Sequence, residues 1–180
     1  MNLTRTKLPL RLARVVLRVP EERDWKGLSR AALDPDTRRA FHRPRGNSNR
    51  KQWAKDWIST SVEAISRGTS LMLTVADVQS DEWVGEVSLE YIDDPPDTAR
   101  LAYSIAPQVR NQGLGFEVAE GMLKIGLRHL RIHTILASCA SSNLPSVKIL
   151  TKLGFAPANP SSLVIPVQPE NGEELWSLHE

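Results

Sequence analysis

The sequence Arg110-Asn111-Gln112-Gly113-Leu114-Gly115 joins two segments with different periodicities. The preceding residues, 100–105, are composed like a strand, and a proline at position 107 ends them. The following residues repeat apolar side chains at helical spacing, which predicts a helix over about 113–130. Glycines allow backbone N–H groups to approach a phosphate, and the helix N-terminus and Arg110 add positive charge. The stretch is therefore typical of a diphosphate site, although a glycine pair before a helix is often only a tight turn.

Two common nucleotide-binding patterns do not fit this turn. The chain contains no GxxxxGK[ST] sequence, so a P-loop is unsupported. A dinucleotide fingerprint needs a third glycine three residues after Gly115, whereas Gly121 falls inside the predicted helix. The acidic residue that such a site places further along the chain is also missing near Leu136.

The rest of the chain alternates between strand-like and helix-like segments. Strands are expected over 10–19, 71–76, 83–91, 100–105, 132–139, 163–167 and 174–178. Helices are expected from about 21, over 52–67 and 113–130, and over 145–153. This order predicts an α/β fold with one mixed sheet flanked by helices.

Length and composition favour a single domain over 1–180 with an ordinary globular core. The chain has 180 residues, of which 41% are hydrophobic and 24% charged, and its formal net charge is +2. A lone cysteine, Cys139, excludes an intramolecular disulfide and favours a reducing compartment. No apolar run reaches the length of a membrane span, so we expect a cytoplasmic protein without a membrane partner. The near-neutral charge balance and few aromatic residues also argue against a nucleic-acid partner.

Several elements in the correct order resemble the GCN5-related N-acetyltransferases (GNAT). Arg110-x-x-Gly113-x-Gly115 matches the R/Q-x-x-G-x-G/A signature of that family. The strand 102–107, Asn143-Leu144-Pro145-Ser146 and the Leu-Gly-Phe at 153–155 are similar to its ribosomal-protein N-terminal acetyltransferase branch. The resemblance implies a mostly antiparallel mixed sheet in which two parallel strands splay into a V that holds acetyl-CoA, without a metal.

The resemblance also assigns residues to the cofactor. Backbone N–H groups of residues 112–116 would bind the pyrophosphate, the strand at Ser104 and Ile105 would pair with the pantetheine arm, and Asn143 and Ser146 would contact the cofactor. The cofactor-binding candidates are thus Ser104, Ile105, Arg110, Gln112, Gly113, Leu114, Gly115, Phe116, Asn143 and Ser146. Ser146 and Asn143 could instead serve only to cap or begin a helix.

Two departures from the family leave the catalytic groups open. Arg100 stands where relatives often place a glutamate, and Leu150 stands where other acetyltransferases place a tyrosine that acts as the general acid. Ser146 is then the candidate acid, and Glu86 or Glu90 the candidate base. Even-numbered positions of their strand share one face, although solvated strand residues are the alternative.

The acceptor is expected to be a primary amine, either a protein N-terminus or a small molecule. The candidate contacts are Phe41, Trp53, Trp57 and Tyr103, which could equally be core residues. The basic residues 43–50 could face an acidic acceptor or the 3′-phosphate of CoA, or remain a solvated loop. His129 and His133 lack further ligands, so no metal is expected. A longer acyl group, a non-catalytic CoA-binding domain, and a monomeric or homodimeric state all remain open.

Overall fold

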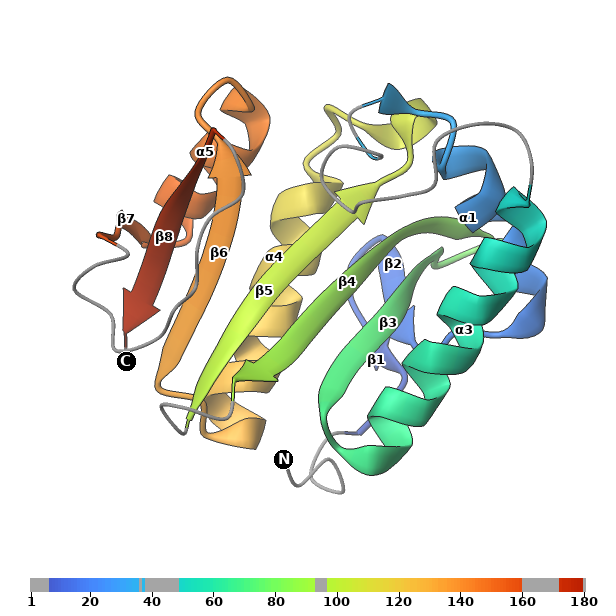
Figure 1. Cartoon of the computed structure of the whole chain (residues 1–180), viewed down its shortest axis with the longest axis horizontal. Helices are drawn as coiled ribbons and strands as arrows, with labels where there is room; N and C mark the ends of the chain where they lie inside the picture. The colour runs from blue at the N-terminus through green and yellow to red at the C-terminus, as the bar shows by residue number, and fades with distance from the viewer. Residues whose placement is uncertain (1–6, 36, 38–48, 93–96, 160–171, 180) are drawn as a thin grey trace.

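The fold is organised by one sheet with helices on both faces (Figure 1). The computed structural model describes residues 7–35, 37, 49–92, 97–159 and 172–179. Within these residues the strand order is β1-β2-β3-β4-β5-β6-β8-β7. The strands are β1 Leu10–Arg11, β2 Val15–Arg18, β3 Ser70–Asp77, β4 Trp83–Ile92, β5 Thr98–Ile105, β6 Thr134–Ala140, β7 Ala156–Pro157 and β8 Glu173–His179.

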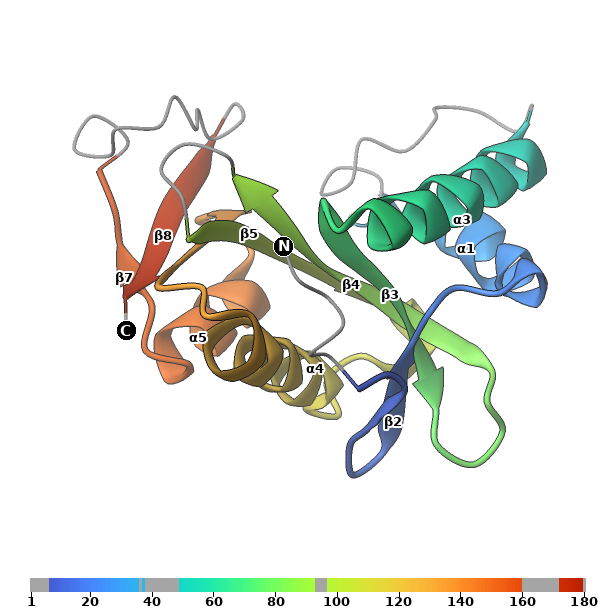
Figure 2. The same cartoon turned by 90° about the horizontal axis from the view of Figure 1, so that it is seen from below.

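The helices divide between the two faces of the sheet. Their bounds are η2 Glu22–Asp24, α1 Trp25–Ala31, α3 Arg50–Arg67, η3 Pro107–Val109, α4 Leu114–Lys124, the π-helical η4 Ile125–His129, and α5 Leu144–Lys152. Figure 2 shows α4 and α5 on one face and α1 and α3 on the other. A ligand that reaches between two strands would therefore meet different helices on each face.

Such an opening exists between β5 and β6, the one parallel pair in the described sheet. Their register runs only from Thr98↔Thr134 to Arg100↔Leu136. Beyond that point β5 continues with β4 to Ile105, while β6 continues with β8 to Ala140. The two strands thus splay into a V, and the expected mixed, mostly antiparallel sheet with a splayed parallel pair is confirmed.

The main core lies between the sheet and α4. It is built from strand residues such as Leu73 and Leu89 and from the apolar stripe of α4, including Val118 and Met122, all almost completely buried. Truncating a leucine in such a core to alanine costs about 2–5 kcal/mol. The arms of the V are consequently held on a rigid support.

A smaller cluster packs α1 against α3. Its buried members are Leu28, Ala54 and Ile58, and four tryptophans surround them: Trp25, Trp53, Trp57 and Trp83. Burial of these apolar side chains holds α3 on the face of the sheet opposite α4.

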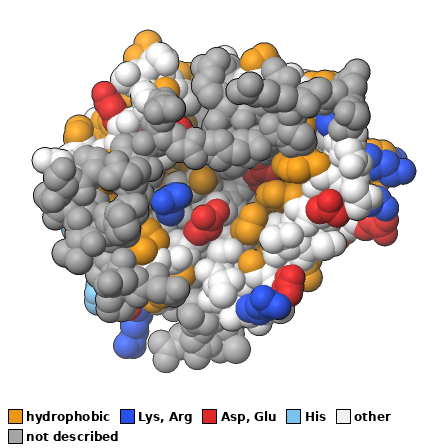
Figure 3. All heavy atoms as spheres, in the orientation of Figure 1, with side chains coloured by type: hydrophobic (Ala, Val, Ile, Leu, Met, Phe, Trp, Pro, Cys, Tyr) orange, Lys and Arg blue, Asp and Glu red, His pale blue; other side chains and the backbone are white. Residues whose placement is uncertain are grey.

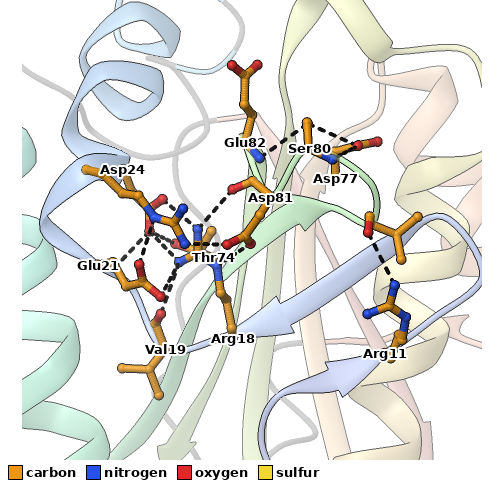
Figure 4. A network of polar contacts seen from close by, with 12 residues as sticks. Arg11, Arg18, Val19, Glu21, Asp24, Thr74, Asp77, Ser80, Asp81 and Glu82 are labelled. Carbon is orange, nitrogen blue, oxygen red and sulfur yellow. Dashed lines mark hydrogen bonds and ion pairs between the residues drawn. The ribbon is translucent and has the colours of Figure 1, made fainter.

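A network of charged groups joins β2, η2 and the β3–β4 turn (Figure 4). The two terminal nitrogens of Arg18, Nη1 and Nη2, donate to the Asp24 carboxylate at 2.9 Å, and Arg18 Nε donates to Asp81 at 2.9 Å. Thr74 donates to the same Asp24, which is 2% exposed. Burial opposes the charge of Arg18, but Asp24 and Asp81 outweigh it and raise the pKa of the guanidinium. Asp24 is thus a structural residue of the domain.

Most expected elements agree with the structure, and two differ. The expected strand over 10–19 is wrong, because residues 12–14 turn between β1 and β2 and Leu12 N donates to Val15 O at 2.9 Å. The expected helix over 113–130 changes to π-helical hydrogen bonding after Lys124. The expected strand over 163–167 lies outside the described residues. None of the helices described is long and apolar enough to cross a membrane.

Candidate functional site

The turn before α4 leaves its first amides without a protein acceptor. Gly113 has φ +79°, a left-handed conformation that glycine adopts without strain, and no side chain caps the helix. The first amide with a partner is that of Glu117, which donates to Gly113 O at 3.2 Å. Between described residues, no hydrogen bond uses the N–H groups of residues 112–116. A helix N-terminus of this kind can bind an anion.

Two cations border this turn, and neither was anticipated from the sequence. Arg14, on the turn between β1 and β2, donates to Glu117 at 2.8 Å and to the carbonyl oxygen of Gln112. Lys152 of α5 lies over the Phe116 ring, with its Nζ 4.1 Å from the ring centroid. Only the tertiary fold brings these charges together, since Arg14 is 103 residues from Glu117.

The Arg110 side chain is directed elsewhere. Its Nη2 donates to Asp34 Oδ2 at 2.6 Å and to Thr37 Oγ1 at 2.9 Å, and its Nε donates to Ile105 O at 3.0 Å. Burial would raise the pKa of Asp34, but hydrogen bonds from Arg110 and Thr37 prevail and lower it. The charge that the sequence assigns to a phosphate is paired here with a carboxylate beyond the end of α1.

Ser104 and Ile105 lie where β5 has left β6. Beyond Arg100 the edge of β5 that faces β6 has no strand partner among the described residues, whereas its other edge stays paired with β4. An edge of this kind offers backbone groups to an extended ligand. These two residues thus lie at the open end of the V.

Tyr103 and Ser146 meet from opposite arms of the V. Tyr103 Oη of β5 lies 3.0 Å from Ser146 Oγ in the first turn of α5. Burial raises the pKa of Tyr103 to about 12, although the Ser146 hydrogen bond lowers it in part. Burial also raises the pKa of Cys139 on β6, which Ser146 partly offsets. Three polar groups from β5, β6 and α5 therefore gather at one place.

Asn143 caps α5. Its Oδ1 accepts the Ser146 backbone N–H at 3.3 Å, as expected of an asparagine at this position. This alternative to cofactor contact was open in the sequence, and the structure shows the cap itself.

The two candidate bases lie on the opposite face of the sheet from Tyr103. Glu86 is 2% exposed and is in register with Ser104, while Glu90 is exposed and in register with Arg100. Ser88, between them, pairs with Met72, which receives a 3.8 Å contact from Ser61 of α3. Both glutamates therefore belong to the α3 face, and only Glu86 is buried within it.

The expected acceptor contacts are not gathered in one place. Trp53 and Trp57 pack in the α1–α3 cluster, whereas Tyr103 faces α4, where it lies near Gly115. Phe41 lies outside the described residues. Figure 3 shows that the α3 face is hollowed near its centre, with apolar and charged side chains around the hollow. No group of three or more potential metal ligands occurs in the part of the chain that the structure describes.

Comparison with known proteins agrees with this geometry. Residues 14–156 match the sequence model of the acetyltransferase (GNAT) domain. The chain belongs to the GNAT family. The uncharacterized N-acetyltransferase YnaD of Bacillus subtilis (strain 168) is 28% identical to it over 79 residues, 44% of either protein. The match thus spans less than half the length of that curated relative.

Two solved structures share the fold of this GNAT chain. The GNAT-family acetyltransferase from Bacillus anthracis superposes with a TM-score of 0.75 and 20% identity, covering 94% of this chain and 97% of that one. Mycobacterium smegmatis RimJ in complex with CoA-disulfide gives a TM-score of 0.73 and 18% identity, covering 96% and 88%. At these identities the likeness concerns the fold alone.

Proposed function

We propose that this chain transfers an acetyl group from acetyl-CoA to a primary amine. The observation that carries the proposal is the row of backbone N–H groups at residues 112–116, which no described residue accepts, placed beside the open end of the V. Family membership and the CoA bound to the structurally similar RimJ support the same cofactor. Bound acetyl-CoA supplies the thioester that the amine attacks.

The residues present fit this cofactor. A glycine at φ +79° leaves the amides of the α4 turn accessible, and Arg14 and Lys152 place positive charge beside them. Ser104 and Ile105 offer an extended backbone edge to the amide-containing arm. Arg110 contributes by fixing the turn through Asp34 rather than by charge, and Asn143 by holding the start of α5.

The proposed base and the proposed acid lie on opposite faces of the sheet. Glu86 on the α3 face is the proposed base for the incoming ammonium, and Glu90 the alternative, because an amine must lose its proton before it attacks. Ser146 on the α5 side is the proposed acid for the departing thiol. The amine and the thioester would thus approach from opposite faces and meet within the V.

The acceptor is proposed to lie on the α3 face, and both a protein N-terminus and a small amine suit the same chemistry. Phe41, Trp53 and Trp57 remain the candidate contacts, and Tyr103 is separated from the two tryptophans by the sheet. One sheet includes strands from both ends of the described chain, which supports a single domain over 1–180.

Thiol release from acetyl-CoA tests the proposal directly. The enzyme is presented with peptides bearing free N-termini, polyamines and amino sugars, and release is compared between the wild type and Glu86→Gln. We expect turnover with at least one class of acceptor and a loss of about 100-fold or more in the variant. CoA-dependent thermal stabilisation without turnover on any acceptor would instead favour a non-catalytic CoA-binding domain. That alternative stays open because Arg100 and Leu150 replace a glutamate and a tyrosine of the family pattern.

A further inference from the structure

The α5 helix does not carry a tyrosine at the position where other acetyltransferases place one. Leu150 stands there, 1% exposed within the main core, and has no proton to donate. The nearby hydroxyl group comes from β5 instead, since Tyr103 Oη lies 3.0 Å from Ser146 Oγ. The phenol thus enters from the other arm of the V.

The direction of this hydrogen bond follows from the two hydroxyl groups. A phenol O–H is a stronger hydrogen-bond donor and a weaker acceptor than the hydroxyl of a serine, so Tyr103 is assigned as the donor of this pair; burial, which raises its pKa to about 12, keeps its proton in place. Ser146 Oγ then accepts, and its own proton can be donated to a second acceptor: Cys139 Sγ, with which it interacts, or a ligand in the V. A hydroxyl rotor without this partner would have no fixed direction.

We propose that Tyr103 is a positioning residue that donates to Ser146 Oγ and thereby directs the Ser146 O–H at the sulfur of the bound cofactor. The inference rests on the proposed function, because it needs CoA in the V. No proton has to leave Tyr103. The amine nitrogen forms the new bond to the acetyl carbon and gives its proton to the proposed base, while the carbon–sulfur bond breaks and the sulfur keeps the electron pair. The Ser146 O–H stabilises that charge by a hydrogen bond, through which the thiolate can then be protonated.

The surroundings keep the tyrosine in place. A Cβ built on Gly115 of α4 would lie 3.8 Å from Tyr103 Cε2 and 3.0 Å from Ile149 Cδ1, so the ring packs beside the diphosphate turn. The titratable neighbour is Cys139 of β6, whose pKa burial raises, with Glu173 and Glu174 of β8 adding to that rise. These groups define the controls that a pH-dependent experiment requires.

The decisive measurement is the affinity for CoA and for desulfo-CoA, which lacks the thiol, by calorimetry between pH 7 and 9.5. A hydrogen bond to the thiolate favours the charged form, so binding lowers the pKa of the CoA thiol. Wild-type affinity for CoA should therefore rise with pH relative to desulfo-CoA. Tyr103→Phe and Ser146→Ala should each lose most of that rise, about 3- to 10-fold at the upper end.

Two controls separate positioning from structure. Tyr91, on β4, is the other tyrosine of the chain, and its hydroxyl group lies 3.5 Å from Asp97. Tyr91→Phe should therefore keep the wild-type pH dependence. Cys139→Ala should keep it as well, because the titration belongs to the ligand. In turnover, Tyr103→Phe should lower kcat by about 3- to 10-fold with little change in KM for acetyl-CoA. The double variant with Ser146→Ala should be no worse than Ser146→Ala alone.

An undiminished rise in CoA affinity with pH in Tyr103→Phe would overturn the inference, as would additive losses in the double variant. Wild-type turnover of amines would still uphold the proposed function in that case. Absence of CoA binding to the wild type would overturn both.

Discussion

Helices α4 and α5 begin on the same face of the sheet, yet their N-termini are treated in opposite ways. In α5, Asn143 accepts the amide of Ser146 at 3.3 Å, and a proline occupies the first turn. In α4, Gly113 provides no side chain, and no described residue accepts the amides of residues 112–116. The start of α5 therefore has a side chain that accepts one of its backbone N–H groups, whereas the first N–H groups of α4 have no acceptor among the described residues.

This difference shows how capping separates a structural helix start from a binding one. Backbone N–H groups at a helix start are unfavourable when they have no acceptor, and water, a ligand or a capping side chain can supply one. Gly113 has no side chain that could cap α4, which is consistent with an anion accepting these N–H groups. Four variants test this comparison, ordered from the largest expected effect to the smallest.

The largest effect is expected from Gly113→Val. A β-branched residue at φ +79° is strained and would obstruct the amides beside Arg14, which lies 3.5 Å from a Cβ built there. CoA affinity measured by calorimetry should fall roughly 10- to 100-fold, because hydrogen bonds to charged groups contribute about 1.5–3 kcal/mol. Gly172→Val is the matched control, since Gly172 has φ +82° with no atom within 4 Å of a Cβ there. Unchanged CoA affinity in Gly113→Val would contradict the diphosphate assignment.

The cap of α5 should behave in the reverse manner. Asn143→Ala removes the acceptor of the Ser146 amide and should lower the free energy of unfolding by about 0.5–2 kcal/mol. Urea denaturation measures this loss, and Asn143→Ser, which restores a capping oxygen, should recover most of it. A larger loss of CoA affinity than of stability would show that Asn143 serves the cofactor more than the helix.

Arg14 tests the charge around the open N-terminus. Arg14→Ala should weaken CoA binding about 3- to 10-fold at low salt, and the difference should shrink as ionic strength rises. Arg11→Ala is the control, because the Arg11 side chain donates to Val78 O after β3 at 3.3 Å and makes no hydrogen bond or ion pair with the described residues of the turn before α4 (Figure 4). Equal effects of the two variants would point to a general charge effect instead of a local contact.

The smallest effect concerns Asp34, which holds Arg110 away from the phosphate position. The folded-state pKa of Asp34 lies below its usual value, so its contribution to stability is complete above the unfolded pKa, near ~3.9, and is lost as the pH falls through the folded value. The difference in Tm between wild type and Asp34→Asn should therefore be present at pH 6 and shrink as the pH falls below the unfolded pKa. CoA affinity at pH 7 should change less than about threefold. A difference in Tm that grows on acidification would refute the ion pair as a source of stability.

The sequence predicted what periodicity and glycine determine locally. The strand before Arg110, the helix after Gly113 and the left-handed Gly154 after α5 all follow from short-range spacing, and each lies where it was expected. The turn at 12–14 was missed because Leu12-Ala13-Arg14 contains no glycine, proline or asparagine. Its position is instead fixed by packing, since Leu12 contacts Gly121 of α4.

The partners of the site residues could not be predicted in this way. Arg110 pairs with Asp34 across 76 residues, and Tyr103 with Ser146 across 43. Such pairs depend on which face of a strand each residue occupies and on the crossing of elements, which a one-dimensional pattern does not contain. The glycines and the family resemblance indicated the turn before α4 as a site, but neither indicated that the Arg110 guanidinium beside it is paired with Asp34.

The short parallel contact between β5 and β6 has a consequence for the solubility of the protein. Strands with open backbone edges usually invite pairing with other copies of a chain, and proteins shield them with charge, proline or distortion. Here the open edge of β5 is turned toward its neighbour in the same sheet, with α4 and α5 closing one side. An edge that would otherwise promote aggregation thus faces the second arm of the V, so the divergence that would admit the proposed cofactor also screens the edge from other copies of the chain.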